Sequence, residues 1–303
     1  MSKISLREKQ KMQKEKSKIP FVFFGTSAFS VGVLNALKEK GFVPLAVVTR
    51  EDKPQGRGLE LTPSETKIWA TIHGLPVLQP ARLDSEFAFQ LSTFNFQLFV
   101  VASYGKIIPK EIFGLPPRKT LNVHPSLLPK LRGASPIQNT ILQSEEIGIT
   151  IMEISEKMDE GPIVAQEKVE IKDASPNNPP RADILEELLA RSGGELLARI
   201  LPDWVEGKIK SVAQDESQAT YCKKIEKLDA EINLFGDPLE NLRKIRAYFG
   251  WPDAFTIFKN KYGKEVRVII KDAEIKDGVF SPTRVVPAGK REMDWDEFLR
   301  GNA

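Results

Sequence analysis

The chain is poor in the residues that build disulfides and metal sites. Of its 303 residues, one is cysteine and two are histidine. A single cysteine, Cys222, excludes an internal disulfide framework and is typical of a reducing compartment, so we expect a cytoplasmic protein and interpret Cys222 as structural. His73 stands alone in a helix-like segment, and no metal-ligand spacing is present. We therefore expect no metal.

Long apolar runs and a large charge of one sign are also absent. No stretch approaches the roughly 20 apolar residues that span a bilayer, and a formal net charge of +3 is too small to indicate a nucleic-acid-binding protein. The first 18 residues carry seven lysines or arginines and two glutamates without an apolar core, which excludes a secretory signal. We interpret residues 1–18 as a basic, flexible extension. The alternative is a basic arm that contacts RNA phosphates.

Two common enzyme signatures are missing as well. The turn at Gly25 resembles the first turn of a nucleotide-binding fold, but Gly-x-Gly-x-x-Gly is absent, which disfavours a dinucleotide site. No serine or cysteine stands in a recognisable nucleophile elbow. The sequence therefore favours a protein that positions two substrates against each other.

What is present is an alternation of short apolar runs with segments of helical spacing. The apolar runs predict strands at residues 21–24, 43–48, 98–102, 121–123 and 148–154. Helical spacing separates them, around residues 29–40, 63–73, 85–94 and 135–143. This order predicts an α/β fold with a Rossmann-like, mostly parallel sheet that is covered by helices on both faces.

The character of the chain changes after about residue 208. A helix is predicted at residues 183–201, with a break at Pro202 and Gly207. Residues 254–258, 265–271 and 279–286 are typical of strands joined by polar turns. We expect a first domain over residues 19–207, linker included, and a second, smaller β-rich (OB-like) domain over residues 208–303.

One run of residues carries most of the chemistry. Asn122 and His124 are two apart, so on an extended strand their side chains project to the same side, and residues 125–129 form a stiff loop beside them. Asn122 can donate an N–H to a developing oxyanion, and His124 can be neutral or charged at working pH. Asp159 could orient the imidazole and move a proton. A histidine that only satisfies the backbone at a strand end is the alternative; the three groups together favour acyl-group chemistry.

The run Asn122-Val-His124-Pro-Ser-Leu-Leu-Pro129, with Asp159, is similar to the signature of the 10-formyltetrahydrofolate-dependent formyltransferases. Other segments resemble the members that act on methionyl-tRNA: Phe24-Gly-Thr26, Gly56-Arg-Gly58, residues 101–109, residues 132–138, Ala219-Thr-Tyr221, residues 245–248, Trp251-Pro252 and residues 287–290. The resemblance covers about residues 20–303. It implies a formyltransferase fold, and transfer of the formyl group of 10-formyltetrahydrofolate to the α-amino group of methionyl-initiator tRNA, for translation initiation.

The resemblance also implies roles for individual residues. Asn122, His124 and Asp159 would be catalytic. The folate site would be lined by Ser126, Leu127, Leu128 and Pro129, with the backbone around Lys106, Ile107 and Ile108 facing the pterin. Gly56, Arg57 and Gly58 would lie in an inserted loop that grips the acceptor end of the tRNA, and residues 208–303 would form a tRNA-binding domain. The implied partners are initiator methionyl-tRNA and folate, without a metal or a membrane, and we expect a monomer.

The chain departs from the family pattern in two places. Leu59-Glu60-Leu61 follows Gly-Arg-Gly where the family usually has basic residues, so a weaker grip on RNA phosphates is expected. The C-terminal domain is shortened between Lys276 and Pro287.

Three other functions remain open from the sequence. Two are enzymatic: formylation of an amino sugar nucleotide and hydrolysis of formyl-folate. The Gly-Arg-Gly loop and the Ala-Gly-Lys segment at the chain's end argue against both. The third is a non-catalytic folate- or RNA-binding protein, against which the intact set of Asn122, His124 and Asp159 argues.

Overall fold

The computed structural model of the protein describes residues 19–55, 60–172 and 174–302. The chain forms two compact units: Met1–Arg132, Gly148–Val169 and Glu187–Ala219 make the first, and Gly133–Ile147, Glu170–Glu186 and Thr220–Ala303 make the second. The predicted extension at residues 1–18 lies outside the described residues. The domains predicted at residues 19–207 and 208–303 stay a prediction.

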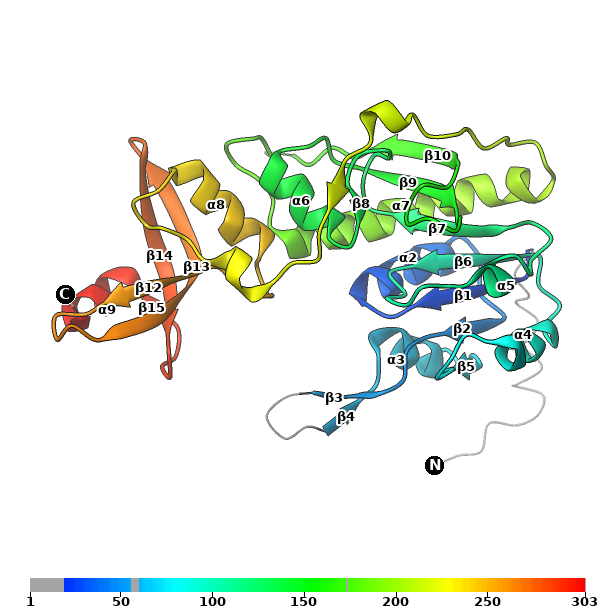
Figure 1. The fold of residues 1–303 in the computed structure, drawn as a ribbon, viewed down its shortest axis with the longest axis horizontal. Coiled ribbons are helices and arrows are strands. Elements are labelled where there is room, and N and C mark those ends of the chain that lie inside the picture. Colours follow the sequence, from blue (N-terminus) through cyan, green and yellow to red (C-terminus); the bar gives the residue numbers. More distant parts are fainter. Residues whose placement is uncertain (1–18, 56–59, 173, 303) are drawn as a thin grey trace. The chain divides into compact units, whose positions relative to one another are not determined.

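A seven-stranded sheet forms the centre of the first unit (Figure 1). Its order is β10-β9-β7-β6-β1-β2-β5. The five strands from β7 to β5 pair in parallel, whereas β9 is antiparallel to both β7 and β10. The strands are β1 (Phe21–Gly25), β2 (Ala46–Val48), β5 (Val77–Leu78), β6 (Leu98–Ala102), β7 (Thr120–His124), β9 (Gly148–Glu153) and β10 (Ile163–Lys168). The predicted mostly parallel sheet is confirmed.

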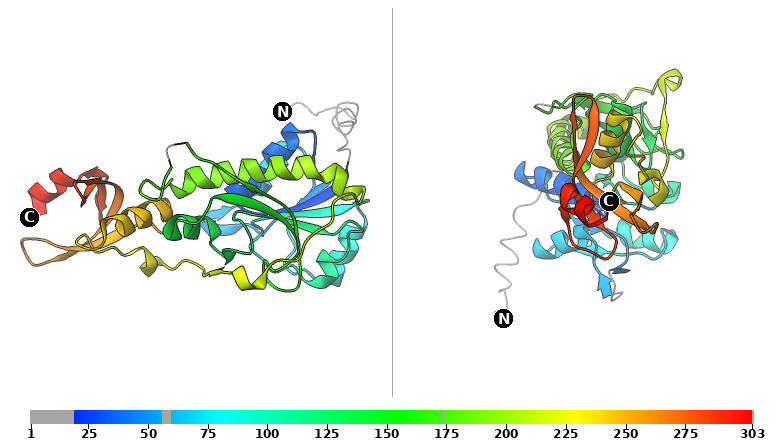
Figure 2. Two further views of the ribbon diagram at one scale, coloured as in Figure 1. Left: turned by 90° about the horizontal axis from the view of Figure 1, so that it is seen from above. Right: turned by 90° about the vertical axis from the view of Figure 1, so that its left-hand side faces the viewer.

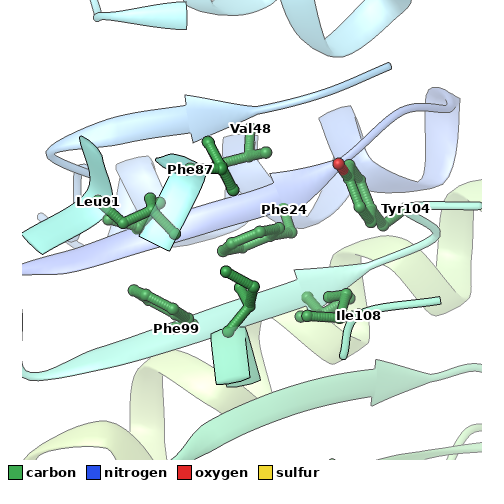
Figure 3. Packing of buried hydrophobic residues seen from close by; sticks show 10 residues of the cluster. Phe24, Val48, Phe87, Leu91, Phe99, Tyr104 and Ile108 are labelled. Atoms are coloured by element: carbon green, nitrogen blue, oxygen red, sulfur yellow. The ribbon is translucent and has the colours of Figure 1, made fainter. Parts of the chain in front are cut away.

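Helices cover both faces of this sheet because its central strands are apolar on both sides. On one face, α4 (Ser85–Ser92) and α5 (Lys110–Phe113) bury a cluster that includes Phe24, Phe87 and Phe99 (Figure 3). On the other face, α2 (Ala28–Glu39) and α7 (Ala182–Val205) lie against each other (Figure 2). The first unit also holds α3 (Glu65–Ile72).

Two glycines let α7 approach closely. A side chain at Gly193 would place its Cβ 2.5 Å from Cγ1 of Val123, and one at Gly194 would meet the Cβ of Ala36 at 2.6 Å. Both distances are shorter than side chains tolerate, so only glycine allows this packing.

The carboxyl ends of β1 and β6 form the edge where the sheet's strand order reverses. The chain passes from β1 to β2 on one side and returns to β6 on the other side of β1, and ligands of open α/β sheets bind at such a switch point. Hydroxyl groups tie the two strand ends together here: Ser30 donates to the Ala102 carbonyl at 2.6 Å, and Thr26 donates to the Tyr104 carbonyl at 2.8 Å.

A hairpin leaves the same edge, directly after β2. It consists of β3 (Lys53–Gln55) and β4 (Glu60–Thr62). Asp52 anchors its base, because its carboxylate accepts hydrogen bonds from Lys67 at 2.7 Å and from Gln79 at 2.8 Å. The hydrogen bond from Lys67 is the main reason that the pKa of Asp52 lies below its usual value. Gly56, Arg57 and Gly58 lie between the two strands and outside the described residues.

The second unit holds an antiparallel sheet in the order β12-β13-β14-β15. Its strands are β12 (Phe255–Lys259), β13 (Glu265–Lys276), β14 (Val279–Pro287) and β15 (Met293–Asp294), accompanied by α6 (Pro136–Gln143), α8 (Pro238–Ala247) and α9 (Trp295–Asn302). A tight turn at Asp277-Gly278 joins β13 to β14. The short strands are β8 (Arg132–Gly133) and β11 (Tyr221–Cys222), and the 3-10 helices are Glu216–Gln218 and Lys227–Ala230. Cys222 is buried.

The predicted elements need three changes. The strand expected at residues 43–48 is confined to β2 at Ala46–Val48. The break expected at Pro202 does not occur, because α7 continues to Val205 before Gly207 adopts a φ of +76°. The elements that were not predicted are α5, α8, α9, β3, β4, β5, β8, β10, β11, β15 and the two 3-10 helices. In the described part of the chain, no helix is both long and apolar enough to cross a membrane.

Candidate active site

Strand β7 presents Asn122 and His124 on one face and Val123 on the other. Val123 faces α7, where Gly193 leaves room for its side chain. Since side chains alternate along a strand, Asn122 and His124 point away from α7. Asn122 is half-buried and His124 is 4% exposed. The pair sits at the carboxyl end of β7, beside the end of β6, which is the edge identified above.

The amide of Asn122 is free to bind a ligand. Within the described residues, no protein group forms a hydrogen bond with this side chain. Its N–H donors are held on a rigid central strand, so they are fixed in position before any substrate arrives. Such a fixed donor is what stabilises a developing oxyanion.

The protein fixes the orientation of the His124 ring. Nε2 lies 3.1 Å from the carbonyl oxygen of Leu131. A carbonyl only accepts hydrogen bonds, so Nε2 carries a proton and donates it there. The other ring nitrogen, Nδ1, lies 3.7 Å from Oδ1 of Asp159. Nδ1 is therefore the atom that can exchange a proton or bond to a reacting group.

Asp159 reaches His124 from a turn in the left-handed backbone region. Its φ is +56°, a conformation that aspartate adopts more readily than most residues. Its side chain is 15% exposed. Gly161, two residues after Asp159 in the turn, packs so closely that a side chain there would collide with the Glu153 carbonyl. The turn thus holds the carboxylate beside the imidazole.

The loop after β7 is stiff because its own backbone is bonded. Ser126 is buried and donates to the Lys130 carbonyl at 2.7 Å. The Leu128 N–H donates to Thr150 at 3.1 Å, and the Leu128 carbonyl accepts from Gln166 at 2.6 Å. Leu127 and Pro129 are half-buried. Of the four residues predicted to line the folate site, these two are the more exposed.

The segment after β6 lies at the same edge, because β6 and β7 are parallel neighbours. Lys106 donates its ammonium group to the Pro80 carbonyl at 3.0 Å, and Ile108 is buried in the cluster of Figure 3. Ile107 is 84% exposed. An exposed isoleucine at the carboxyl edge of a sheet is suited to an apolar contact with a flat ring.

Arg132 and Gln214 were not predicted as site residues. The guanidinium of Arg132 is fully buried and donates to the side-chain oxygen of Gln214 at 2.9 and 3.1 Å, as well as to Glu216. The hydrogen bonds that Arg132 donates to Glu216 are the main reason that the pKa of Glu216 lies below the usual value. Arg132 and Gln214 are 82 positions apart, so no motif spacing in the sequence could have predicted their contact.

No arrangement of metal ligands accompanies these groups. Over residues 19–55, 60–172 and 174–302, no cluster of three or more His, Cys, Asp or Glu side chains could hold a metal ion. The polar side chains that meet at this edge are an amide, an imidazole and a carboxylate.

Comparisons with known proteins give a consistent result. A family model described as Formyl transferase matches residues 17–179. A methionyl-tRNA formyltransferase of Geobacillus sp. (strain WCH70) is 37% identical over 306 aligned positions, which cover 93% of this chain and 94% of the relative. The solved structure of a methionyl-tRNA formyltransferase from Clostridium thermocellum matches with a TM-score of 0.58 at 17% identity, over 89% of this chain and 98% of that one.

A solved structure with a bound folate also shares the fold. HypX from Aquifex aeolicus in complex with tetrahydrofolic acid matches with a TM-score of 0.63 and 18% identity. The match covers 93% of this chain and 47% of HypX.

Proposed function

The chain belongs to the formyl transferase family, among the methionyl-tRNA formyltransferases, and from this we propose that it formylates the α-amino group of methionyl-initiator tRNA. The formyl donor is 10-formyltetrahydrofolate, which is a co-substrate. The product supports translation initiation.

One observation carries the proposal at the level of the site. Nδ1 of His124 approaches the Asp159 carboxylate to 3.7 Å, on the same strand face as the unbonded amide of Asn122. An oxyanion donor and a proton-exchanging pair are what acyl transfer to an amine requires.

In the first step, the amine nitrogen of methionyl-tRNA attacks the formyl carbon. A carbon–nitrogen bond forms, and the electron pair of the carbonyl moves to the oxygen. Asn122 donates to this oxyanion, and His124, once protonated on Nδ1, donates as well. The Asp159 carboxylate lies 3.7 Å from this nitrogen.

In the second step, the tetrahedral intermediate collapses and the bond between the formyl carbon and N10 of the folate breaks. The attacking amine loses one proton and N10 gains one. The His124–Asp159 pair carries this proton, so that no net proton is consumed. The products are formyl-methionyl-tRNA and tetrahydrofolate.

The folate and the tRNA occupy the carboxyl edge of the sheet. Ser126 to Pro129 and the backbone of Lys106 to Ile108 line the folate site, where the exposed Ile107 supplies an apolar surface. Gly56, Arg57 and Gly58, between β3 and β4, contact the acceptor end of the tRNA. The protein acts as a monomer in the cytoplasm.

The test supplies 10-formyltetrahydrofolate with one of three acceptors: methionyl-initiator tRNA, a charged elongator tRNA or an amino sugar nucleotide. We expect formyl transfer to the initiator tRNA, measured as labelled formyl-methionine released from the tRNA. Formyl transfer only to the amino sugar nucleotide would show that this sugar, and not methionyl-tRNA, is the acceptor. Folate binding without transfer or hydrolysis would indicate a non-catalytic protein.

A further inference from the structure

Three consecutive residues of the Asp159 turn are held by one buried pair of side chains. The Gln214 amide donates to the carbonyl of Asp159 and to that of Gly161, each at 2.7 Å. The carboxylate of Glu160 lies 3.8 Å from Nη1 of Arg132. Arg132 and Gln214, which bond to each other, therefore contact Asp159, Glu160 and Gly161 in turn.

The amide of Gln214 has one possible orientation. On one side stands the guanidinium of Arg132, which only donates, and on the other stand two carbonyls, which only accept. The oxygen of the amide must face Arg132 and its nitrogen must face the turn. Because Gln214 is 8% exposed and Arg132 is fully buried, water does not compete for these bonds.

The segment that carries Arg132 also orients His124. Leu131, the residue before it, provides the carbonyl that accepts from Nε2 of His124 at 3.1 Å. One end of the proton-exchanging pair is thus fixed by Leu131, and the other end is fixed through Arg132 and Gln214. Because Leu131 and Arg132 are consecutive residues, one short segment sets the distance between Nδ1 of His124 and the Asp159 carboxylate.

We infer that Arg132 and Gln214 are positioning residues of the formyl-transfer site: they hold the Asp159 turn so that its carboxylate stays aligned with Nδ1 of His124. The inference rests on the proposed function, but neither side chain touches a substrate. Their effect on the reaction passes through Asp159 alone.

Gln214→Glu separates this role from a merely structural one. Glutamate has nearly the same shape and still accepts from Arg132, but a carboxylate cannot donate to the carbonyls of Asp159 and Gly161. We expect kcat to fall about 10- to 100-fold, as for a catalytic group misplaced by a fraction of an ångström. KM for folate and for tRNA should change less than about threefold, since uniform binding is untouched. Gln218→Glu adds the same charge at an exposed site and should keep the wild-type kcat.

A double mutant tests whether the effect passes through Asp159. In an Asp159→Asn background, adding Gln214→Glu should leave kcat unchanged, because there is no carboxylate left to position. If the two substitutions lower kcat independently, so that their effects multiply, the inference is overturned. The formyl transfer itself would still be established. A wild-type kcat for Gln214→Glu alone would overturn the inference too. Arg132→Lys, which replaces the planar guanidinium and its several fixed donors by a single ammonium nitrogen, should reproduce the loss of kcat.

A spectroscopic measurement tests the same inference without activity. The chain has two histidines, so its NMR spectrum contains two sets of imidazole resonances. Gln214→Glu should move the His124 resonances, while those of His73 stay in place. Unmoved His124 resonances in a folded variant would contradict the inference, whether or not the wild type transfers formyl groups.

Discussion

Asn122 and His124, at the end of β7, differ in their hydrogen-bond partners. Asn122 has no protein partner among the described residues, whereas His124 is bonded on Nε2 and faced by a carboxylate on Nδ1. An unpaired donor beside a constrained ring supports the proposed role of Asn122, because polar side chains in purely structural positions are mostly hydrogen-bonded within the protein.

Removing either member of the proton-exchanging pair should stop the reaction without unfolding the protein. We expect His124→Ala and Asp159→Ala to lower kcat by orders of magnitude, since loss of one such group costs on the order of 3 kcal/mol of barrier or more. Circular dichroism and thermal melting should change little. His73→Ala, at the end of α3, is the matched control and should keep its activity. Near-normal rates in both site variants would show that the chemistry lies elsewhere.

Tyr104 carries a buried hydroxyl group without a hydrogen-bond partner in the described residues. Tyr104→Phe removes this group and no hydrogen bond, so we expect the free energy of unfolding to stay constant or to rise by up to about 1 kcal/mol. Equilibrium urea denaturation measures it. A loss above about 1 kcal/mol would mean that the hydroxyl group has a partner.

The same variant has a pH signature. Burial raises the pKa of Tyr104 to about 12 from 10.0, so the folded state favours the neutral phenol. This contribution is fully present below pH 10 and is lost as the pH rises toward 12, because the unfolded chain ionises first. The stability of Tyr104→Phe relative to the wild type should therefore increase between pH 9 and pH 11. A constant difference over this range would contradict the assignment.

At the scale of elements, the packing of α7 on the sheet depends on glycine. Alanine favours helices over glycine by about 1 kcal/mol, but at Gly193 its Cβ would stand 2.5 Å from Val123 and 3.1 Å from Ile149. We expect Gly193→Ala to lower the melting temperature, since overpacking costs about 1–3 kcal/mol. Val123 lies between the two site residues, so kcat should fall too.

Gly301 in α9 is the control for this substitution. Nothing lies within 4 Å of a Cβ built there. Gly301→Ala should leave the protein as stable as the wild type or slightly more so. Equal effects of the two substitutions would mean that helix propensity, not packing, decides at Gly193.

The sequence predicted the helices and strands whose apolar residues recur at a regular spacing. In the first unit, the strands β1, β2, β6, β7 and β9 and the helices α2, α3, α4 and α7 were predicted to within a few residues, because burial on the sheet enforces the pattern. Residues 238–247 form α8 although their spacing drew no prediction; Asp237 and Pro238 are its start signal, with the Asp237 side chain accepting from the Glu240 N–H. Because proline disfavours a helix interior, a break was predicted at Pro202, yet α7 continues for one more turn to Val205.

The site was predictable only where its residues are close in sequence. Asn122 and His124 share a strand, and Asp159 follows one helix and one strand later. Gln214 bonds to residues more than 50 positions away, and a single glutamine in a polar stretch carries no signal of that kind. Long-range positioning bonds become visible only in the folded chain.

At the scale of the whole molecule, the positive charge is concentrated at the start of the chain. Residues 1–18 carry seven basic and two acidic side chains, so the remaining residues, with 37 basic and 39 acidic, are slightly negative. The net positive charge available for contacts with tRNA phosphates therefore lies in residues 1–18.

Deleting residues 2–18 should therefore weaken tRNA binding and flatten its salt dependence. Each phosphate contact that is lost reduces the slope of log K against log salt concentration by roughly 0.7–0.9. Filter binding between 50 and 200 mM salt measures both quantities. Replacing the seven basic residues by glutamine at constant length is the control for chain removal. Unchanged affinity and slope would show that this segment does not touch the RNA.

The burial of Cys222 has a practical consequence. As the only thiol in the chain, and one that is 7% exposed, it reacts with a thiol reagent only when its surroundings open. The rate of labelling then reports the frequency of that opening under native conditions, without any engineered probe. A second cysteine placed on an exposed position would react at once, and so could carry a fluorophore while Cys222 stays unlabelled.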